Sequence, residues 1–204
     1  MRITSSRFGN GKPIPAAFAM GTPDGFGGNR NPPLAWSEVP DGTRSFALLC
    51  IDPDAPSDAS LANADGIEIA VAHPRGDFVH WVMVDIAADL REIAEGRCSD
   101  GVTKAGKTAP AGPAGARQGS NSYTQWFDAD AEMGGQYFGY DGPYPPANDL
   151  RLHRYFFRLF ALDVATLALP DGFTAGDVQR AMHGHVLGEA LTWGSYTLNP
   201  KVRG

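Results

Sequence analysis

Two histidines and a pair of aspartates are the residues of this chain that could do chemistry together. Asp52 and Asp54 stand in the run Asp52–Pro56, where prolines hold the backbone rigid. His80 and His153 lie far from that run in sequence, each near the start of an apolar stretch. Carboxylate and imidazole groups can hold a divalent metal, serve as base and orienting group in a hydrolase, or surround a small anion.

Three predicted strands would bring these groups together. Each strand is apolar, with the period-two alternation of a buried or half-buried strand. Asp52 ends the first strand, whereas His80 and His153 stand near the beginnings of the other two. Antiparallel neighbours place the end of one strand beside the start of the next, so we expect the three side chains to meet at one sheet edge. The predicted strands cover residues 45–52, 78–86 and 152–163.

The Asp-Pro run has a purely structural interpretation as well as a functional one. Short aspartate side chains next to prolines commonly satisfy backbone N–H groups of a turn. The sharp turn after a buried strand also predicts a cis Ala55–Pro56 bond, which costs little at proline. Convergence with two histidines favours a site over a simple turn.

Of the three chemistries, an anion pocket fits the sequence best. Tyr155, two residues after His153 on the same strand face, adds a hydroxyl donor. A hydrolase would need an activated nucleophile, and Ser120 and Ser122 stand in a loop without a catalytic motif. A metal site with two imidazoles and a carboxylate remains an alternative. No nucleotide-binding motif is present, so we expect no nucleotide cofactor. Because the anion pocket is the preferred chemistry, we expect no other cofactor, no catalytic residue and no metal.

Composition limits the class of protein. A length of 204 residues suits one domain, 1–204, and 25 glycines with 16 prolines favour a turn-rich, mainly β architecture. The net charge of −6 leaves no basic stripe for nucleic acid, and no apolar stretch approaches membrane-spanning length. Cys50 and Cys98 are expected to be free thiols. These features predict a cytoplasmic protein without integral membrane association.

The pattern predicts few helices. Thr174, with Asp177 three residues later, is typical of a helix start. Apolar residues at helical spacing from Val178 to Trp193 predict that this helix continues to Gly194. Shorter helical segments are expected at residues 88–95 and 164–169.

Five ordered motifs resemble the phosphatidylethanolamine-binding protein family, and most closely its bacterial branch, the Raf kinase inhibitor-like proteins. The resemblance spans nearly the whole chain. The motifs are Asn31-Pro32-Pro33-Leu34-Ala35-Trp36, Asp52-Pro53-Asp54-Ala55-Pro56, Phe78-Val79-His80-Trp81, Gly139-Tyr140-Asp141-Gly142-Pro143-Tyr144-Pro145-Pro146 and His153-Arg154-Tyr155.

The resemblance implies an antiparallel two-sheet β-fold with a few peripheral helices, one of them near the C-terminus. It implies a non-enzymatic binding protein that captures phosphorylated ligands or phosphoprotein partners, and a homodimer. The implied anion pocket is lined by Asp52, Ala55, Pro56, His80, Gly142, Pro146, His153 and Tyr155, and we add their neighbours Asp54 and Phe78 as candidate binding residues.

Two features depart from the bacterial pattern. Tyr144 stands where those relatives usually carry a cysteine, which would narrow the pocket mouth. The segment 124–138 is longer and more aromatic than usual. The remaining alternative is therefore a protein that binds its partners through this loop.

Overall fold

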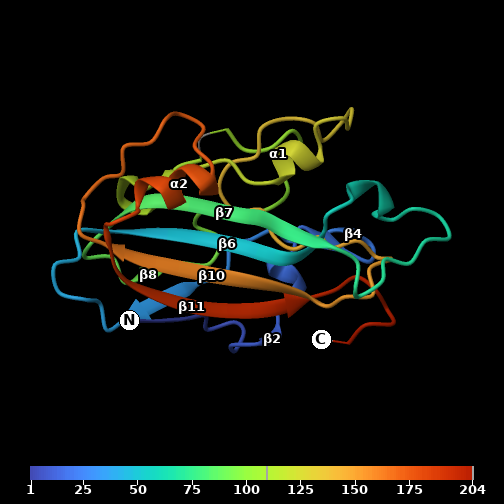
Figure 1. Cartoon of the computed structure of the whole chain (residues 1–204), viewed down its shortest axis with the longest axis horizontal. Coiled ribbons are helices and arrows are strands. Elements are labelled where there is room, and N and C mark those ends of the chain that lie inside the picture. Colours follow the sequence, from blue (N-terminus) through green and yellow to red (C-terminus); the bar gives the residue numbers. More distant parts are fainter. Residues whose placement is uncertain (109, 204) are drawn as a thin grey trace.

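The computed structural model describes residues 1–108 and 110–203 and is organised around one long sheet (Figure 1). Neighbours in this sheet are antiparallel, apart from β2 and β11, which run parallel. The three strands expected around the site are its centre. In spatial order the sheet consists of β2 (Lys12–Pro13), β11 (Val186–Tyr196), β10 (His153–Leu162), β6 (Ser45–Pro56), β7 (Arg75–Ala87) and β9 (Arg117–Gln118).

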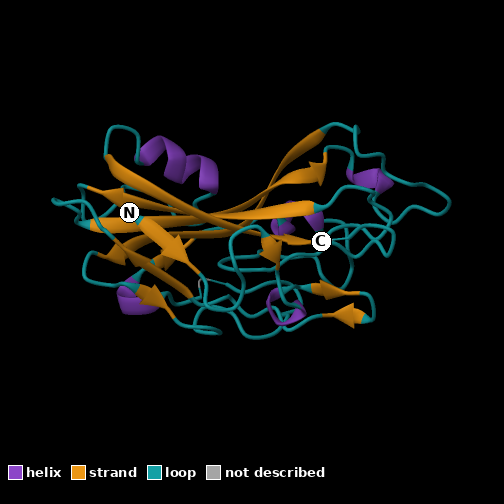
Figure 2. Cartoon of the chain, turned by 90° about the horizontal axis from the view of Figure 1, so that it is seen from below, coloured by secondary structure: helices purple, strands orange, loops and turns teal. Residues whose placement is uncertain are grey.

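Smaller elements cover the two faces of the long sheet (Figure 2). The second sheet contains β1 (Arg2–Thr4), β5 (Leu34–Ser37) and β8 (Glu92–Ile93), and β3 (Gly21–Thr22) with β4 (Gly25–Phe26) forms a separate hairpin. The helices are α1 (Tyr123–Trp126) and α2 (Ala175–Ala181), with 3-10 turns at Ala16–Phe18, Ala59–Leu61 and Pro113–Gly115. None of the helices in the described ranges is long and apolar enough to cross a bilayer.

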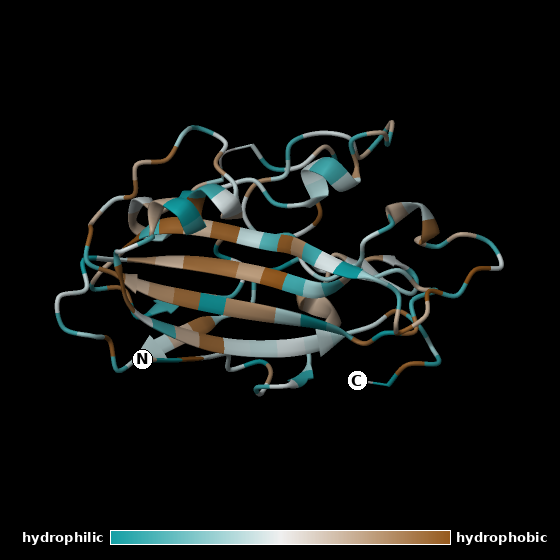
Figure 3. Cartoon of the chain, viewed as in Figure 1, coloured by the Kyte–Doolittle hydropathy of each residue, from teal (hydrophilic) through white to brown (hydrophobic). Residues whose placement is uncertain are grey.

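Both faces of β6 are buried from Phe46 to Ile51, which explains why this part of the strand is continuously apolar (Figure 3). Its alternate residues enter different hydrophobic clusters. The cluster shared with the second sheet takes Phe46, Leu48 and Cys50. The cluster shared with α2 takes Ala47, Leu49 and Ile51. Burial of each large apolar side chain contributes about 1.5–3 kcal/mol, so this strand is firmly held up to the point where Asp52 begins the site.

The predicted helix from Thr174 is correct only at its start. The capping box forms, but α2 ends at Ala181, and β11 follows where more helix was expected. Val178, Met182, Val186 and Ala190 lie four residues apart, a spacing that fits a helix and, because it is even, one face of a strand as well. Gly184, at φ +83°, ends the helical segment, and pairing with the edge of β10 stabilises the strand.

Three other sequence expectations are wrong. Residues 88–95 form a turn and the short strand β8, and residues 164–169 form bends without a helix. In each segment one apolar side chain is fully buried in the core, Ile93 in the first and Leu167 in the second. No described peptide bond is cis, so the Ala55–Pro56 turn is made with a trans bond.

The capping box of α2 offers a direct test of this local structure. Thr174 Oγ1 accepts a hydrogen bond from the Asp177 amide, and the Asp177 carboxylate accepts one from the Thr174 amide at 2.8 Å. Thr174→Ala is expected to lower the free energy of unfolding by about 1 kcal/mol in urea titrations. The matched control is Thr103→Ala on the exposed surface, expected to change stability by less than about 0.5 kcal/mol. Equal effects of the two substitutions would contradict the capping assignment.

Candidate functional site

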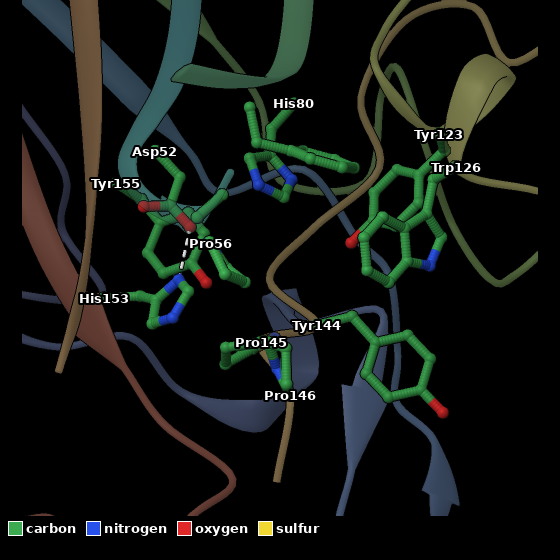
Figure 4. A pocket seen from close by; sticks show the side chains of 12 residues that line it. Asp52, Pro56, His80, Tyr123, Trp126, Tyr144, Pro145, Pro146, His153 and Tyr155 are labelled. Atoms are coloured by element: carbon green, nitrogen blue, oxygen red, sulfur yellow. Dashed lines mark hydrogen bonds and ion pairs between the residues drawn. The ribbon is translucent and has the colours of Figure 1, made fainter. Parts of the chain in front are cut away.

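The ends of three long strands form a pocket in which the predicted residues meet (Figure 4). Asp52 pairs with Phe78, so the end of β6 lies beside the start of β7. On its other edge β6 pairs antiparallel with β10, which begins at His153. The expectation that Asp52, His80 and His153 converge is confirmed. All three side chains are buried, with at most 3% of their surface exposed.

His153 is held between two carboxylates. Its Nδ1 lies 2.6 Å from Asp52 Oδ2, and its Nε2 lies 3.1 Å from Asp149 Oδ2. Carboxylate oxygens accept hydrogen bonds, so the doubly protonated imidazolium satisfies both contacts. Burial opposes this charge, but the hydrogen bonds to Asp149 and Asp52 outweigh it and raise the pKa of His153 to about 9. His153 is therefore a cation at neutral pH, and neither ring nitrogen is free for a ligand.

Asp149 has a second cationic partner. Arg75 Nη1 donates to Asp149 Oδ2 at 2.5 Å, and Nη2 donates to Asp149 Oδ1 at 3.1 Å. Burial would raise the pKa of Asp149, but the hydrogen bonds from His153 and Arg75 outweigh it and lower the pKa to about 2. Asp52, His153, Asp149 and Arg75 thus form a buried chain of alternating charges with a net charge of zero.

His80 has a different environment and remains neutral. Its Nδ1 donates to the carbonyl oxygen of Asp141 at 2.8 Å, and the Asp141 amide donates to the carbonyl oxygen of His80 at 3.0 Å. Burial lowers the pKa of His80 below its usual value, although the Asp52 and Asp141 charges act in the opposite direction. The reciprocal bonds fix the ring orientation and leave Nε2 as the atom available to a ligand.

The Asp141 carboxylate is itself fixed by a buried network. It accepts hydrogen bonds from Asn29 at 2.8 Å and Asn121 at 2.9 Å, and Lys107 Nζ lies 2.5 Å away. The side chains of Asn29, Asn121 and Asp141 are almost fully buried. His80 is therefore positioned by a network that extends away from the pocket.

Tyr155 places an unsatisfied hydroxyl at the pocket. Its side chain is 1% exposed, and its oxygen has no hydrogen-bond partner among the described residues. The ring packs edge-on against His80, with 5.0 Å between centroids. Buried hydroxyls without a partner are uncommon and costly, so this atom is suited to a ligand or a bound water.

Eight of the ten predicted site residues line the pocket, which has a cavity volume of about 30 Å³. That volume holds a water molecule or a comparably small ligand group. The eight are Asp52, Ala55, Pro56, Phe78, His80, Pro146, His153 and Tyr155; the other lining residues are Tyr123, Trp126, Tyr144 and Pro145.

Asp54 and Gly142, the other two predicted site residues, lie outside the pocket. The Asp54 carboxylate binds Arg151 at 2.5 Å and Arg154 at 2.7 Å. The β6–β7 pairing is interrupted between Asp52 and Ala55, and this irregularity separates the two aspartates. Gly142 lies behind the pocket-lining residue Tyr123, whose hydroxyl donates a hydrogen bond to the Gly142 carbonyl oxygen at 2.8 Å.

Sequence reasoning missed Asp149, Arg75 and Tyr123, and took Asp141 only as part of a motif. Asp149 stands four residues before His153, a spacing that could have drawn attention to it. The role of Arg75 had no comparable signal, because its partner is 74 residues away.

The two alternative chemistries, a hydrolase and a metal site, make different demands on the residues that line the pocket. The residues that line the pocket include no serine, threonine or cysteine to act as nucleophile. Among the residues placed in the structure, no group of three or more His, Cys, Asp or Glu side chains is arranged to hold a metal ion. A metal ion bound at His153 would have to displace a ring proton that is hydrogen-bonded to a carboxylate.

The charge on His153 predicts how stability depends on pH. Its pKa is about 9 in the folded protein and about 6.5 in an unfolded chain, so folding is coupled to proton uptake between these values. The stabilisation, about 3 kcal/mol, should be fully present below pH 6.5 and should be lost as pH rises through 9. Urea unfolding at intervals from pH 6 to pH 10 measures this decline.

Two variants separate His153 from other titrating groups. His153→Gln should remove this part of the decline, whereas His185→Gln, which alters an exposed pair with Asp163, should keep it. An NMR titration of the His153 ring gives the pKa directly if the first variant does not fold. A ring that loses its proton near pH 6.5 would contradict the assignment.

Comparison with known proteins identifies the family of this chain. A family model described as phosphatidylethanolamine-binding protein matches residues 4–197. A relative from Methanothermobacter thermautotrophicus, named UPF0098 protein, is 35% identical over 96% of this chain and 98% of its own length. A second, from Aquifex aeolicus, has the same name and is 33% identical over 96% of this chain and 88% of its own length.

Solved structures extend the likeness to three dimensions. A structure described as a homologue of phosphatidylethanolamine-binding protein, from Chlamydia trachomatis, has a TM-score of 0.64 and 27% identity, covering 96% of this chain and 95% of its own. YbcL of Escherichia coli, described as a member of the mammalian family, has a TM-score of 0.69 with 24% identity, covering 96% and 97%, and supports the fold alone. The match along residues 4–197 and the shared fold show that this chain belongs to the phosphatidylethanolamine-binding protein family.

Proposed function

We propose that the pocket binds the phosphate group of a small phosphorylated molecule without chemical turnover. The observation that carries the proposal is the buried Tyr155 hydroxyl, which has no partner among the described residues. A phosphate oxygen placed against this hydroxyl would accept its hydrogen bond. Hydrogen bonds to charged groups are stronger than those between neutral groups, so a phosphate would compensate the burial cost well.

His80 supplies the second contact. Because its Nδ1 is committed to the Asp141 carbonyl, Nε2 is the atom that meets the ligand. A hydrogen bond between Nε2 and a phosphate oxygen needs one proton between them. Either the phosphate monoanion brings that proton or His80 takes one up on binding. The bound state therefore holds one proton more than neutral His80 and a free dianion.

The nearby carboxylate does not exclude an anion. Asp52 lines the pocket, but its Oδ1 accepts from the Asp54 amide at 2.8 Å and its Oδ2 contacts His153. The His153 cation, together with Arg75 behind Asp149, compensates the negative charge around the floor. A phosphate would thus meet the Tyr155 hydroxyl, which donates a hydrogen bond, and Nε2 of His80, which shares one proton with it, in front of a compensated charge network.

The interaction-protein alternative has less support. The aromatic residues of the 124–138 segment turn mostly inward, where Tyr137 and Met133 are buried in a cluster with Met20. Trp126 and Phe127 pack against that cluster, and Trp126 also lines the pocket. This loop serves as a pocket wall more than as a free surface. A phosphorylated protein partner and a homodimer remain expectations from the family resemblance, and a cytoplasmic location remains an expectation from the sequence.

The first prediction of this proposed function compares two buried tyrosines. Tyr155→Phe should weaken phosphate binding about tenfold or more, because a hydrogen bond to a charged group is lost. The same change should leave the ligand-free protein as stable as before, since the hydroxyl has no partner to lose. Tyr140→Phe is the control: its hydroxyl donates to the Phe18 carbonyl, so it should cost about 1 kcal/mol of stability and keep binding. Calorimetry and urea unfolding measure both; unchanged phosphate affinity in Tyr155→Phe would refute the proposal.

The second prediction concerns pH. The complex holds one extra proton, so the affinity for phosphate should fall about tenfold per pH unit above the second ionisation of a phosphate ester, near pH 6. Sulfate brings no proton, so its binding requires His80 to be charged. Sulfate affinity should therefore decline as pH rises through the pKa of free His80, which burial lowers below its usual value. Calorimetric titrations of both anions decide; phosphate affinity that increases with pH would contradict this arrangement.

A further inference from the structure

Three aromatic side chains form the outer part of the pocket. Phe78 comes from β7, Trp126 from α1, and Tyr144 from the segment that leads toward β10. In Figure 4, Trp126 and Tyr144 lie on the opposite side of the pocket from Asp52 and His153. Their side chains are half-buried, so they line the route between the floor and solvent. We call these three residues the aromatic mouth.

The rings of the mouth are fixed in place without a ligand. Trp126 packs edge-on against Phe78, with centroids 5.9 Å apart and an interplanar angle of 76°. Tyr144 lies directly on Gly21, where a Cβ atom would come within 1.9 Å of the ring. Phe26 packs against the same ring at 6.2 Å, and the Tyr196 hydroxyl holds the Gly21 carbonyl at 2.9 Å. These side chains have already lost their conformational entropy on folding, so a ligand that packs against them does not have to order them.

The mouth is close to the atoms proposed to bind phosphate. The ring of His80 lies 5.0 Å from Phe78, and Phe78 lies 5.9 Å from Trp126, measured between centroids. The ring contact between His80 and Phe78 therefore leads from the floor into the mouth, and a second contact continues to Trp126. A group bonded directly to the phosphate would reach the mouth without a long linker.

From this arrangement, and resting on the proposed phosphate site, we infer that the preferred ligand is an aryl phosphate whose ring packs against Trp126 and Tyr144. The phosphate occupies the floor at Tyr155 and His80, and the aromatic ring lies in the mouth. Aromatic pairs gain attraction beyond the burial of their area, because ring edges and faces carry opposite partial charges.

A cationic group fits the mouth less well. Aromatic rings also attract ammonium groups, and a nearby carboxylate would strengthen that attraction. Asp52 is the one acidic residue among the lining residues described, and both of its oxygens are already hydrogen-bonded. Arg75 and His153 compensate the charges of Asp52 and Asp149, so this network has no net negative charge that would attract a cation. The charges around this pocket thus favour a neutral ring over a cation next to the phosphate.

Four probes test the inference by calorimetry at one pH: inorganic phosphate, phenyl phosphate, cyclohexyl phosphate and phosphocholine. Phenyl and cyclohexyl phosphate have the same number of ring carbons, so their affinity ratio isolates aromatic character. We expect phenyl phosphate to bind roughly threefold to tenfold more tightly than cyclohexyl phosphate. Equal affinities, or tightest binding of phosphocholine, would overturn the inference while leaving the phosphate site intact. Failure of all four probes to bind would instead reject the proposed function.

Variants locate the effect. Trp126→Leu and Tyr144→Leu should each reduce the ratio of phenyl to cyclohexyl affinity toward one. Trp193→Leu is the matched control, because Trp193 stacks on Phe156 in β10, and neither residue lines the pocket. It should keep the wild-type ratio. A ratio that survives both mouth substitutions would place the aromatic preference elsewhere and overturn the assignment. Circular dichroism of each variant verifies folding, and the wild-type ratio tests the inference even if a variant fails to fold.

Discussion

The contact of the buried His153 cation with Asp52 and Asp149 is the constraint on which the site depends. A charge with 1% exposure is tolerated only when its partners are equally buried and well aligned. One carboxylate comes from the end of β6 and the other from the turn before β10, so the contact ties both segments to the first residue of β10. This contact also fixes the position of Tyr155 at the pocket floor, because Tyr155 lies two residues further along the same face of β10.

The charged residues and the ligand-facing atoms are different groups. His153 and the aspartates form hydrogen bonds with one another. The atoms that remain available to a ligand are the hydroxyl of Tyr155 and Nε2 of His80, and both groups are neutral. Binding at a neutral hydroxyl and a neutral imidazole in front of a compensated network avoids presenting an unpaired charge to solvent when the pocket is empty. It also makes proton uptake part of anion binding, because His80 is the member of the site that is free to change its charge.

The sequence predicted the position of the site better than the bonding within it. Strand periodicity and the ends of strands are local properties, so the convergence of Asp52, His80 and His153 followed from pairing rules alone. Whether an imidazole donates to a ligand or to a carboxylate depends on residues far apart in sequence, such as Asp141 and Asp149. For that reason His153 was expected to meet the anion directly, although both of its nitrogens are occupied.

The error at β11 had a similar origin, because a spacing of four satisfies two periodicities and only the neighbouring strand decides between them. The family resemblance added Ala55, Pro56 and Pro146, positions that carry no chemistry of their own and that the residues alone would not have identified. It also brought in Gly142, which lies behind the wall.

The close contact between Gly21 and the Tyr144 ring has a consequence for how such a pocket can diversify. The two positions share one volume, so a side chain at 21 and a ring at 144 are mutually exclusive. Gly21 belongs to the hairpin of β3 and β4, which forms a separate sheet with no backbone pairing to the long sheet that carries Asp52, His80 and His153. The shape of the pocket entrance can therefore change through side-chain size at positions 21 and 144. The charged contacts of His153 with Asp52 and Asp149 would keep their structure.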